Sequence, residues 1–371
     1  MASITLQNLA HSYHPDPTGP EDFALKELSL EWEDGHAYAL LGPSGCGKST
    51  LLNIMSGLLE PTRGRILFDD RDVTRASTAE RNIAQVFQFP VVYDTMTVGE
   101  NLAFPLRNRG LRASAIAERV ERIARMIGLE DQLSQKARGL TPDRKQKISL
   151  ARGMVREDVN AILFDEPLTV IDPHLKWELR TQLKDLHREF GHTMVYVTHD
   201  QTEALTFAEK VVVMHEGSIV QIGRPRDLFE APAHTFVGYF IGSPGMNLLP
   251  AAINGSRARV GGETVDLGRD YGVPQGKLKL GVRPEFVRLT KGDGLPVSIN
   301  RVQDAGRQKF VNASLGGIDI NLIVDNATAI EAVMNRVTFD TNRISVFADD
   351  WRIEPDQARS TQRGRRHEQD P

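Results

Sequence analysis

The run from Gly42 to Ser49 has the residue types and the spacing that hold a phosphate group. Its glycines let backbone N–H groups turn toward an anion, and a helix that begins at the end of the run would add its N-terminal dipole. Lys48 can reach the β- and γ-phosphates of a nucleotide, and the Ser49 hydroxyl can ligate Mg²⁺. The expected nucleotide contacts are Gly42, Pro43, Ser44, Gly45, Cys46, Gly47, Lys48, Ser49 and Thr50.

The flanking segments decide between a phosphate-binding P-loop and a glycine turn that matches by chance. An apolar run at 38–41 predicts a buried strand, and residues 50–55 predict a helix. Strand, glycine-rich loop and helix form the context that a P-loop needs. Tyr13, at the end of another strand-like segment, is a candidate for stacking on adenine, although an aromatic residue in that place more often packs at a sheet edge.

Two adjacent carboxylates, Asp165 and Glu166, follow the apolar run 161–164. Asp165 at the strand end is placed to hold Mg²⁺ through water, and Glu166 can polarise an attacking water as a general base. An acidic pair at a strand end usually marks only a turn. The P-loop upstream is what favours catalysis here.

Two further polar residues follow predicted strands. His199 comes after the apolar run 194–197, so it would lie at the same sheet edge and bridge the γ-phosphate and Glu166. Without the other motifs, His199 would be interpreted as a structural histidine that caps a helix or makes its hydrogen bonds within the fold. Gln88, after the strand-like residues 83–87, can complete the metal shell and sense the γ-phosphate, which gives Ser49, Gln88 and Asp165 as the expected Mg²⁺ ligands.

The elements that must position these residues alternate along the chain. Continuous apolar runs separated by helical segments predict a largely parallel sheet that is covered on both faces. Residues 98–155 are mostly helical in pattern, with an amphipathic segment at 112–127 whose apolar positions are Ala115, Ile116, Val120, Ile123, Ala124 and Ile127. The remaining predicted strands of this half are residues 3–9, 24–32, 64–69 and 211–214.

Composition limits the class of protein. The chain has 371 residues, which suggests two domains, and its net charge of −4 disfavours a nucleic-acid binder. Its single cysteine, Cys46, excludes an internal disulfide and agrees with a reducing compartment. Because no signal segment and no run of 18 apolar residues occurs, we expect a chain that neither crosses a membrane nor is exported but that can dock on a membrane protein.

The pattern changes near residue 236. Turn formers at 242–245 are followed by short strand-like pieces at 278–282, 318–322 and 343–347, which predict a small all-β, barrel-like domain. From about Gln357 the chain is polar and without periodicity, so we expect a disordered tail. The arginines in it, Arg363, Arg365 and Arg366, are expected to be solvated rather than bound to lipid.

In this order, the motifs resemble those of the ATP-binding subunits of ABC transporters. Residues 42–49 match Walker A, Gln88 the Q-loop, Asp165 and Glu166 Walker B with its glutamate, residues 168–172 the D-loop, and His199 the switch histidine. The resemblance covers nearly the whole chain. Residues 240–244 and 281–285 look like the OB-like β-barrel regulatory domain of the maltose-type sugar and polyol importers, and within that group residues 83–90 and 93–98 most resemble an ATPase subunit of bacterial glycerol importers.

The signature motif departs from that family. Where two such subunits close head to tail on ATP, the family has Leu-Ser-Gly-Gly-Gln, and this chain has Leu140 followed by Thr141, Pro142, Asp143 and Arg144. Thr141 can cap a helix, but Pro142 lacks the N–H that would face the γ-phosphate. Asp143 adds a like charge, and unit charges about 4 Å apart repel by roughly 4 kcal/mol at an effective dielectric near 20, with Arg144 and Lys145 offsetting a part.

The resemblance implies an α/β ABC-type ATPase domain over 1–235, with the helical insert at about 90–155, and a β-rich regulatory domain over 236–356. It further implies ATP and Mg²⁺ as cofactors, catalysis by Lys48, Glu166 and His199, and two transmembrane permease subunits as partners at the cytoplasmic face of the bacterial inner membrane. We expect import of a small polyol or sugar, glycerol first, with an extracytoplasmic solute-binding protein as an indirect partner and no nucleic acid. The altered signature favours a heterodimer with a second, unlike ATPase subunit over a homodimer.

The alternatives are a polyamine or inorganic-anion importer, a soluble ABC-type ATPase of DNA repair or translation, and a small-molecule P-loop kinase. The soluble ATPases would be expected to show coiled-coil heptads or tandem ATPase domains, which the chain lacks. A kinase would not explain Glu166, His199 and residues 140–152 together.

Overall fold

The structure is a computed structural model that describes residues 2–331 and 333–356. It divides into two units, Met1–Pro225 and Arg226–Pro371. This division falls somewhat before the domain boundary at 235/236 that the sequence suggests, because α8 (Pro225–Glu230) and α9 (Thr235–Phe240) lie almost wholly in the second unit. The expected tail from Gln357 on, with its arginines, lies outside the described residues.

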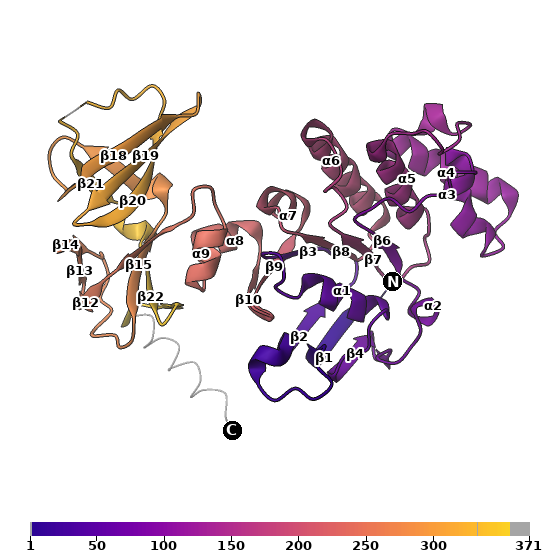
Figure 1. The fold of residues 1–371 in the computed structure, drawn as a ribbon, viewed down its shortest axis with the longest axis horizontal. Helices are drawn as coiled ribbons and strands as arrows, with labels where there is room; N and C mark the ends of the chain where they lie inside the picture. The colour runs from indigo at the N-terminus through magenta and orange to yellow at the C-terminus, as the bar shows by residue number, and fades with distance from the viewer. Residues whose placement is uncertain (1, 332, 357–371) are drawn as a thin grey trace. The chain divides into compact units, whose positions relative to one another are not determined.

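The first unit is built on a six-stranded sheet in the order β10-β9-β3-β8-β7-β6 (Figure 1). Neighbouring strands pair in parallel except for β9 and β10, which form an antiparallel hairpin. Every residue of β3 and β8 is buried, as the continuous apolar runs predict for a sheet covered on both faces. The strands are β3 (Ala37–Leu41), β6 (Ala84–Val86), β7 (Ile162–Asp165), β8 (Met194–Thr198), β9 (Lys210–His215) and β10 (Ser218–Gly223).

A second, antiparallel sheet of this unit has the order β2-β1-β4-β5. Its strands are β1 (Ile4–Ser12), β2 (Phe23–Trp32), β4 (Arg63–Phe68) and β5 (Arg71–Asp72). The register of β1 with β2 shifts after Leu6, after Leu9 and after His11, which bends β1 along its length. Apolar side chains of both sheets and of helix α1 (Lys48–Ser56) form one core, so the helix that follows the glycine-rich loop is fixed between the two sheets.

Helices cover the parallel sheet. In Figure 1, α1 lies on one face of this sheet, and α6 (Pro173–Phe190) and α7 (Gln201–Phe207) lie on the other. The expected helical insert contains α3 (Val98–Arg107), α4 (Ala113–Ile127) and α5 (Pro142–Met154), and the short α2 (Thr78–Arg81) precedes it. The predicted apolar face of α4 is buried except at Ala115, which is exposed, and Arg119 takes part in the buried face instead.

The second unit consists of small antiparallel sheets around a separate apolar core, which agrees with the expected all-β domain. Arg343 was predicted within a strand but belongs to a 3₁₀ turn, Thr341–Arg343, whose entry Asp340 caps with its carboxylate. The sheets are β11-β15-β22-β23, β12-β13-β14, β16-β21-β17 and β18-β19-β20. Their strands are Asn247–Pro250, Ala252–Asn254, Arg257–Val260, Glu263–Asp266, Leu278–Val282, Val287–Thr290, Leu295–Pro296, Ser298–Asp304, Gln308–Leu315, Ile318–Asp325, Arg336–Phe339, Ser345–Ala348 and Trp351–Ile353, which are β11–β23 in order.

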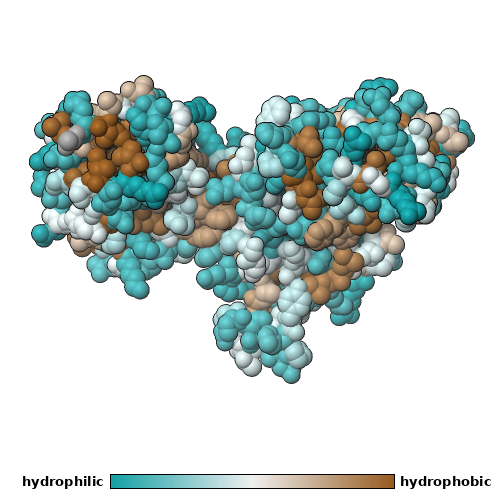
Figure 2. Space-filling view, turned by 45° about the horizontal axis from the view of Figure 1, so that its top comes forward, coloured by the Kyte–Doolittle hydropathy of each residue, from teal (hydrophilic) through white to brown (hydrophobic). Residues whose placement is uncertain are grey.

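Hydrophobic residues reach the surface in several patches, which hydrophilic residues separate on the face drawn in Figure 2. Among residues 2–331 and 333–356, no helix combines the length and the apolar character that spanning a membrane requires.

Candidate functional site

The glycine-rich loop joins β3 to α1 and turns at glycines with left-handed backbone. Gly47 precedes the first residue of α1 with φ +100°, and a Cβ there would lie 2.7 Å from the carbonyl oxygen of Ala24. Gly45 has φ +81°, but a Cβ there would meet no atom within 4 Å, so this part of the loop faces open space. The loop is thus packed on one side and accessible on the other, as a cradle for an anion requires.

Lys48 is only 4% exposed, and its Nζ donates to the carbonyl oxygens of Gly42 (2.8 Å) and Pro43 (2.9 Å). In the described part of the chain it has no carboxylate within ion-pair distance. Its Nζ also lies 3.9 Å from the Cys46 sulfur. None of these partners carries a negative charge, so the buried ammonium fits an anionic ligand and the loop suits the phosphates of a nucleotide. Burial raises the pKa of the neighbouring Cys46 thiol, which therefore stays protonated.

Tyr13 and Thr50, which the sequence assigned separately to the nucleotide, meet in the structure. The Tyr13 hydroxyl lies 3.1 Å from Oγ1 of Thr50, and the rings of His11 and Tyr13 meet in a T-shaped arrangement at a centroid distance of 4.7 Å. The Tyr13 side chain is 63% exposed. An exposed aromatic face held beside the start of α1 suits stacking on a base.

Asp165 is the last residue of β7, and burial raises the pKa of its carboxyl group, as does the neighbouring charge of Glu166. Lys48 and a hydrogen bond from Ser49 act in the opposite direction. The structure therefore brings together two of the three expected Mg²⁺ ligands, both of them oxygen donors that Mg²⁺ prefers. The third, Gln88, is half-buried two residues after β6, and no hydrogen bond within the described chain joins it to Ser49 or Asp165.

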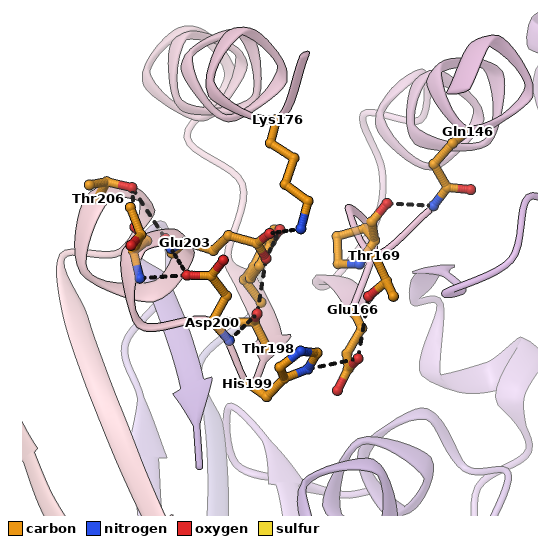
Figure 3. Close-up of polar contacts among 12 residues, drawn as sticks. Gln146, Glu166, Thr169, Lys176, Thr198, His199, Asp200, Glu203 and Thr206 are labelled. Atoms are coloured by element: carbon orange, nitrogen blue, oxygen red, sulfur yellow. Dashed lines mark hydrogen bonds and ion pairs between the residues drawn. The ribbon is translucent and has the colours of Figure 1, made fainter. Parts of the chain in front are cut away.

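Glu166 directly follows β7 with φ +44°, an uncommon backbone conformation for a glutamate. Its N–H donates to the carbonyl oxygen of Val197 (3.0 Å) on the neighbouring strand. Its Oε2 lies 3.1 Å from Nδ1 of His199 and accepts a hydrogen bond from the Thr169 hydroxyl at 3.3 Å (Figure 3). Strain of this kind is found at functional sites, and here it aims a carboxylate at the predicted histidine.

Gln146 of α5 is a site residue that could not be predicted from the sequence. It is fully buried, and its Nε2 donates to the carbonyl oxygens of Phe87 (3.1 Å) and Pro167 (2.8 Å). Phe87 precedes Gln88 and Pro167 follows Glu166, so one amide of the helical insert holds the backbone next to both predicted site residues. A glutamine within an otherwise charged helix start gives no signal of such burial.

Glu203, the third residue of α7, is a second residue that was not predicted from the sequence, and it is only 2% exposed. Its position four residues after His199 was the available signal, because that spacing turns it back toward the strand end.

The altered signature residues open α5. Thr141 occupies the N-cap position and Pro142 the first helical position, with Asp143 half-buried in the first turn and Arg144 exposed. The expected cap by the Thr141 hydroxyl was wrong, because its side chain accepts no backbone hydrogen bond. The expected offset of the Asp143 charge by Lys145 is also reduced, since the Lys145 ammonium pairs with Asp94 at 2.7 Å.

The comparisons with known proteins agree with this geometry. The family described as "ABC transporter" matches residues 25–169. Two relatives carry the name sn-glycerol-3-phosphate import ATP-binding protein UgpC. The protein of Jannaschia sp. (strain CCS1) is 36% identical over 94% of this chain and 99% of its own length, and that of Brucella abortus biovar 1 (strain 9-941) is 39% identical over 95% and 99%.

Two solved structures are similar to about three fifths of the chain. CbiO1 from Clostridium perfringens, part of the ABC transporter complex CbiONQ, has a TM-score of 0.56 at 27% identity and covers 62% of this chain and 90% of its own. An ATP-binding cassette in a dimeric post-hydrolysis state with ADP and Pi has a TM-score of 0.53 at 27% identity, over 60% of this chain and 99% of its own. With such similarity along nearly its whole length, the chain belongs to the family of ABC transporter ATPases, enzymes that hydrolyse ATP with Mg²⁺.

Proposed function

We propose that this chain powers the import of a glycerol-type solute through a membrane permease, from the cytoplasmic face of a bacterial inner membrane. The observation that carries the proposal is the similarity over almost the entire chain to subunits named for sn-glycerol-3-phosphate import. The sequence motifs favour glycerol itself, and both solutes share the same three-carbon polyol. An extracytoplasmic solute-binding protein would deliver the solute to the permease.

In this function, each site residue would have a separate role. Lys48 and the N–H groups of residues 42–49 would hold the phosphates, and Tyr13 would hold the base. Glu166 would take the proton of the attacking water, and His199 would orient that carboxylate. Bound Mg²⁺ supplies charge neutralisation, with Ser49, Asp165 and Gln88 as the residues that would hold it.

A partly apolar surface lies around Gln88 and suits a permease partner. A cavity of about 250 Å³ is lined by residues of β6, of the segment after it, of α3 and of α5, including Val91, Pro105 and Arg152. Large apolar side chains are exposed along the same segment, namely Phe87, Phe89, Val91 and Tyr93. Exposed apolar groups in a row favour a protein interface, and Gln146 connects this segment to α5.

The pairing of two ATPase subunits is a separate part of the proposal. Pro142 and Asp143 open α5 where the family has two glycines, and Lys145 is paired with Asp94 and is a poor counter-charge. A site formed by this chain's P-loop with a partner's intact signature would hydrolyse ATP, and the opposite site would do so slowly. Full-rate, cooperative ATPase activity from the purified chain alone would contradict the heterodimer.

The solute is tested by uptake into proteoliposomes that hold the purified complex with its permease and binding protein. Labelled glycerol and sn-glycerol-3-phosphate are compared with a polyamine and with an inorganic anion. We expect ATP-dependent accumulation of one of the first two. Accumulation of only the polyamine or the anion would refute the glycerol-type assignment and leave the import function standing.

A further inference from the structure

Glu203 is a buried carboxylate whose two oxygens both accept hydrogen bonds. Its Oε2 accepts from the hydroxyls of Tyr196 (3.1 Å) and Thr198 (2.9 Å), and its Oε1 lies 3.1 Å from Nζ of Lys176 (Figure 3). Burial raises the pKa of Tyr196 well above its ordinary value, with the charge of Glu203 as the next cause, so the phenol keeps its proton and donates. The buried charge is therefore fully hydrogen-bonded and has one cationic partner.

This network surrounds the residue that precedes His199. The Thr198 hydroxyl donates to Glu203 and also accepts the N–H of Asp200 at 3.0 Å, which fixes the backbone on both sides of His199. The Asp200 carboxylate in turn accepts the N–H groups of Thr202 and Glu203 and so caps α7. His199 is thus held at the end of β8 by a constrained turn.

Lys176 comes from a different part of the site. It lies in the first turn of α6, directly after residues 168–172, and Asp172 caps that helix by accepting the N–H of His174 at 2.9 Å. In the same segment, the Thr169 hydroxyl donates to Glu166. These contacts are joined by the backbone at two places. Glu166 accepts from Thr169, the backbone leads from Thr169 to Lys176 in α6, and Lys176 pairs with Glu203. Glu203 then holds Thr198, the residue before His199, and His199 lies against Glu166.

We infer that Glu203 and Lys176 are positioning residues for ATP hydrolysis, which couple the segment 168–172 to the placement of His199 against Glu166. A displacement of residues 168–172 moves the start of α6, and Lys176 transmits it to the turn that carries His199. Neither residue contacts the nucleotide site itself. The inference rests on the roles proposed for Glu166 and His199.

The test uses the full chain assembled with its partner subunits and measures kcat and KM for ATP hydrolysis and Kd for ATP. Lys176→Met leaves the Glu203 carboxylate buried without its cation, so we expect kcat to fall about tenfold or more while Kd for ATP changes less than about threefold. Lys176→Arg should restore most of kcat, because a guanidinium also donates to a carboxylate. Adding Glu203→Gln to Lys176→Met removes the unpaired charge and should raise kcat above that of Lys176→Met alone.

Lys184→Met is the matched control. Lys184 lies on the same helix and also reaches α7, where its Nζ donates to the carbonyl oxygen of Thr206 at 3.2 Å, but it does not contact Glu203. We expect kcat within twofold of the unaltered protein. Should Lys176→Met fail to fold, Glu203→Gln alone, which keeps the size of the side chain, should still lower kcat severalfold.

The inference is overturned if Lys176→Met and Glu203→Gln keep kcat within twofold, or if Lys184→Met loses as much as Lys176→Met. Glu166→Gln and His199→Ala, measured beside them, separate this failure from that of the proposed catalytic roles. If those two variants keep full activity, the assignment of Glu166 and His199 is wrong, and the inference falls with it.

Discussion

The Nδ1 atom of His199 lies 3.1 Å from Oε2 of Glu166, although the two residues belong to different strand ends. The register of the parallel strands explains the contact, because Asp165 of β7 pairs with Val197 of β8. Each side chain therefore begins just past its strand at the same edge of the sheet. At that edge, parallel strands of open α/β sheets bring their ligand-binding groups together.

Glu166→Gln keeps the size of the side chain and removes its basicity. We expect kcat to fall by about 10²–10³-fold, within the range that general-base catalysis contributes, with Kd for ATP nearly unchanged. Steady-state ATPase rates and nucleotide titration of the assembled protein measure both. A variant that lost ATP binding along with kcat would show that Glu166 holds the ligand rather than activating water.

A pair of glycine variants tests the cradle. Gly47→Ala would place its Cβ 2.7 Å from the carbonyl oxygen of Ala24 at φ +100°, whereas Gly45→Ala has a positive φ but no neighbouring atom within 4 Å. We expect each variant to lose about 1 kcal/mol of stability through backbone strain. Gly47→Ala should lose more, because of the close contact with Ala24, and should also lose ATP binding. Thermal unfolding and ATP titration compare them, and equal losses in the two variants would contradict the packing argument.

Much of the fold and the site could be predicted from local sequence. The P-loop, Asp165, Glu166 and His199 all directly follow apolar runs, so position along the chain was enough to place them at one sheet edge. The separation of the antiparallel sheet from the parallel one could not be predicted, because strand pairing depends on contacts far apart in sequence.

The parts that sequence missed depend on side-chain burial. Gln146 and Glu203 are polar residues inside helices, where the usual expectation is exposure, and only the packed structure shows their partners. Thr141 shows a different kind of error. Threonine is a favoured N-cap residue, and Thr141 occupies the N-cap position of α5, but its hydroxyl accepts no hydrogen bond from the helix backbone.

Gln146 supplies a further prediction. Gln146→Met fills similar volume but leaves the carbonyl oxygens of Phe87 and Pro167 without this donor, which should lower the free energy of unfolding by about 1–3 kcal/mol and kcat by about tenfold. Gln182→Met is the control, since the Gln182 amide donates to Glu178, whose side chain is 49% exposed, and the substitution should cost less than about 0.5 kcal/mol. Unchanged kcat in Gln146→Met would show that the link does not influence the site.

His192, which lies between α6 and β8, predicts how stability depends on pH. It is 2% exposed, and burial, followed by the charge of Arg119, lowers the pKa of its imidazole to about 4. Between this value and its ordinary pKa of 6.5, the unfolded chain binds more protons than the folded one, so the free energy of unfolding falls as the pH falls from 6.5 toward 4. The loss should reach about 2 kcal/mol at pH 5.

His192→Gln removes this titration, so its stability should change less between pH 7 and pH 5 than that of the unaltered protein. His187, whose pKa is also lowered by burial, contributes a loss of the same sign in both proteins. Guanidinium unfolding at pH 7 and pH 5 measures the loss of stability in each protein. Equal losses in the unaltered protein and in His192→Gln would contradict a neutral, buried His192. A group that titrates equally in the folded and unfolded states cannot change how the free energy of unfolding depends on pH.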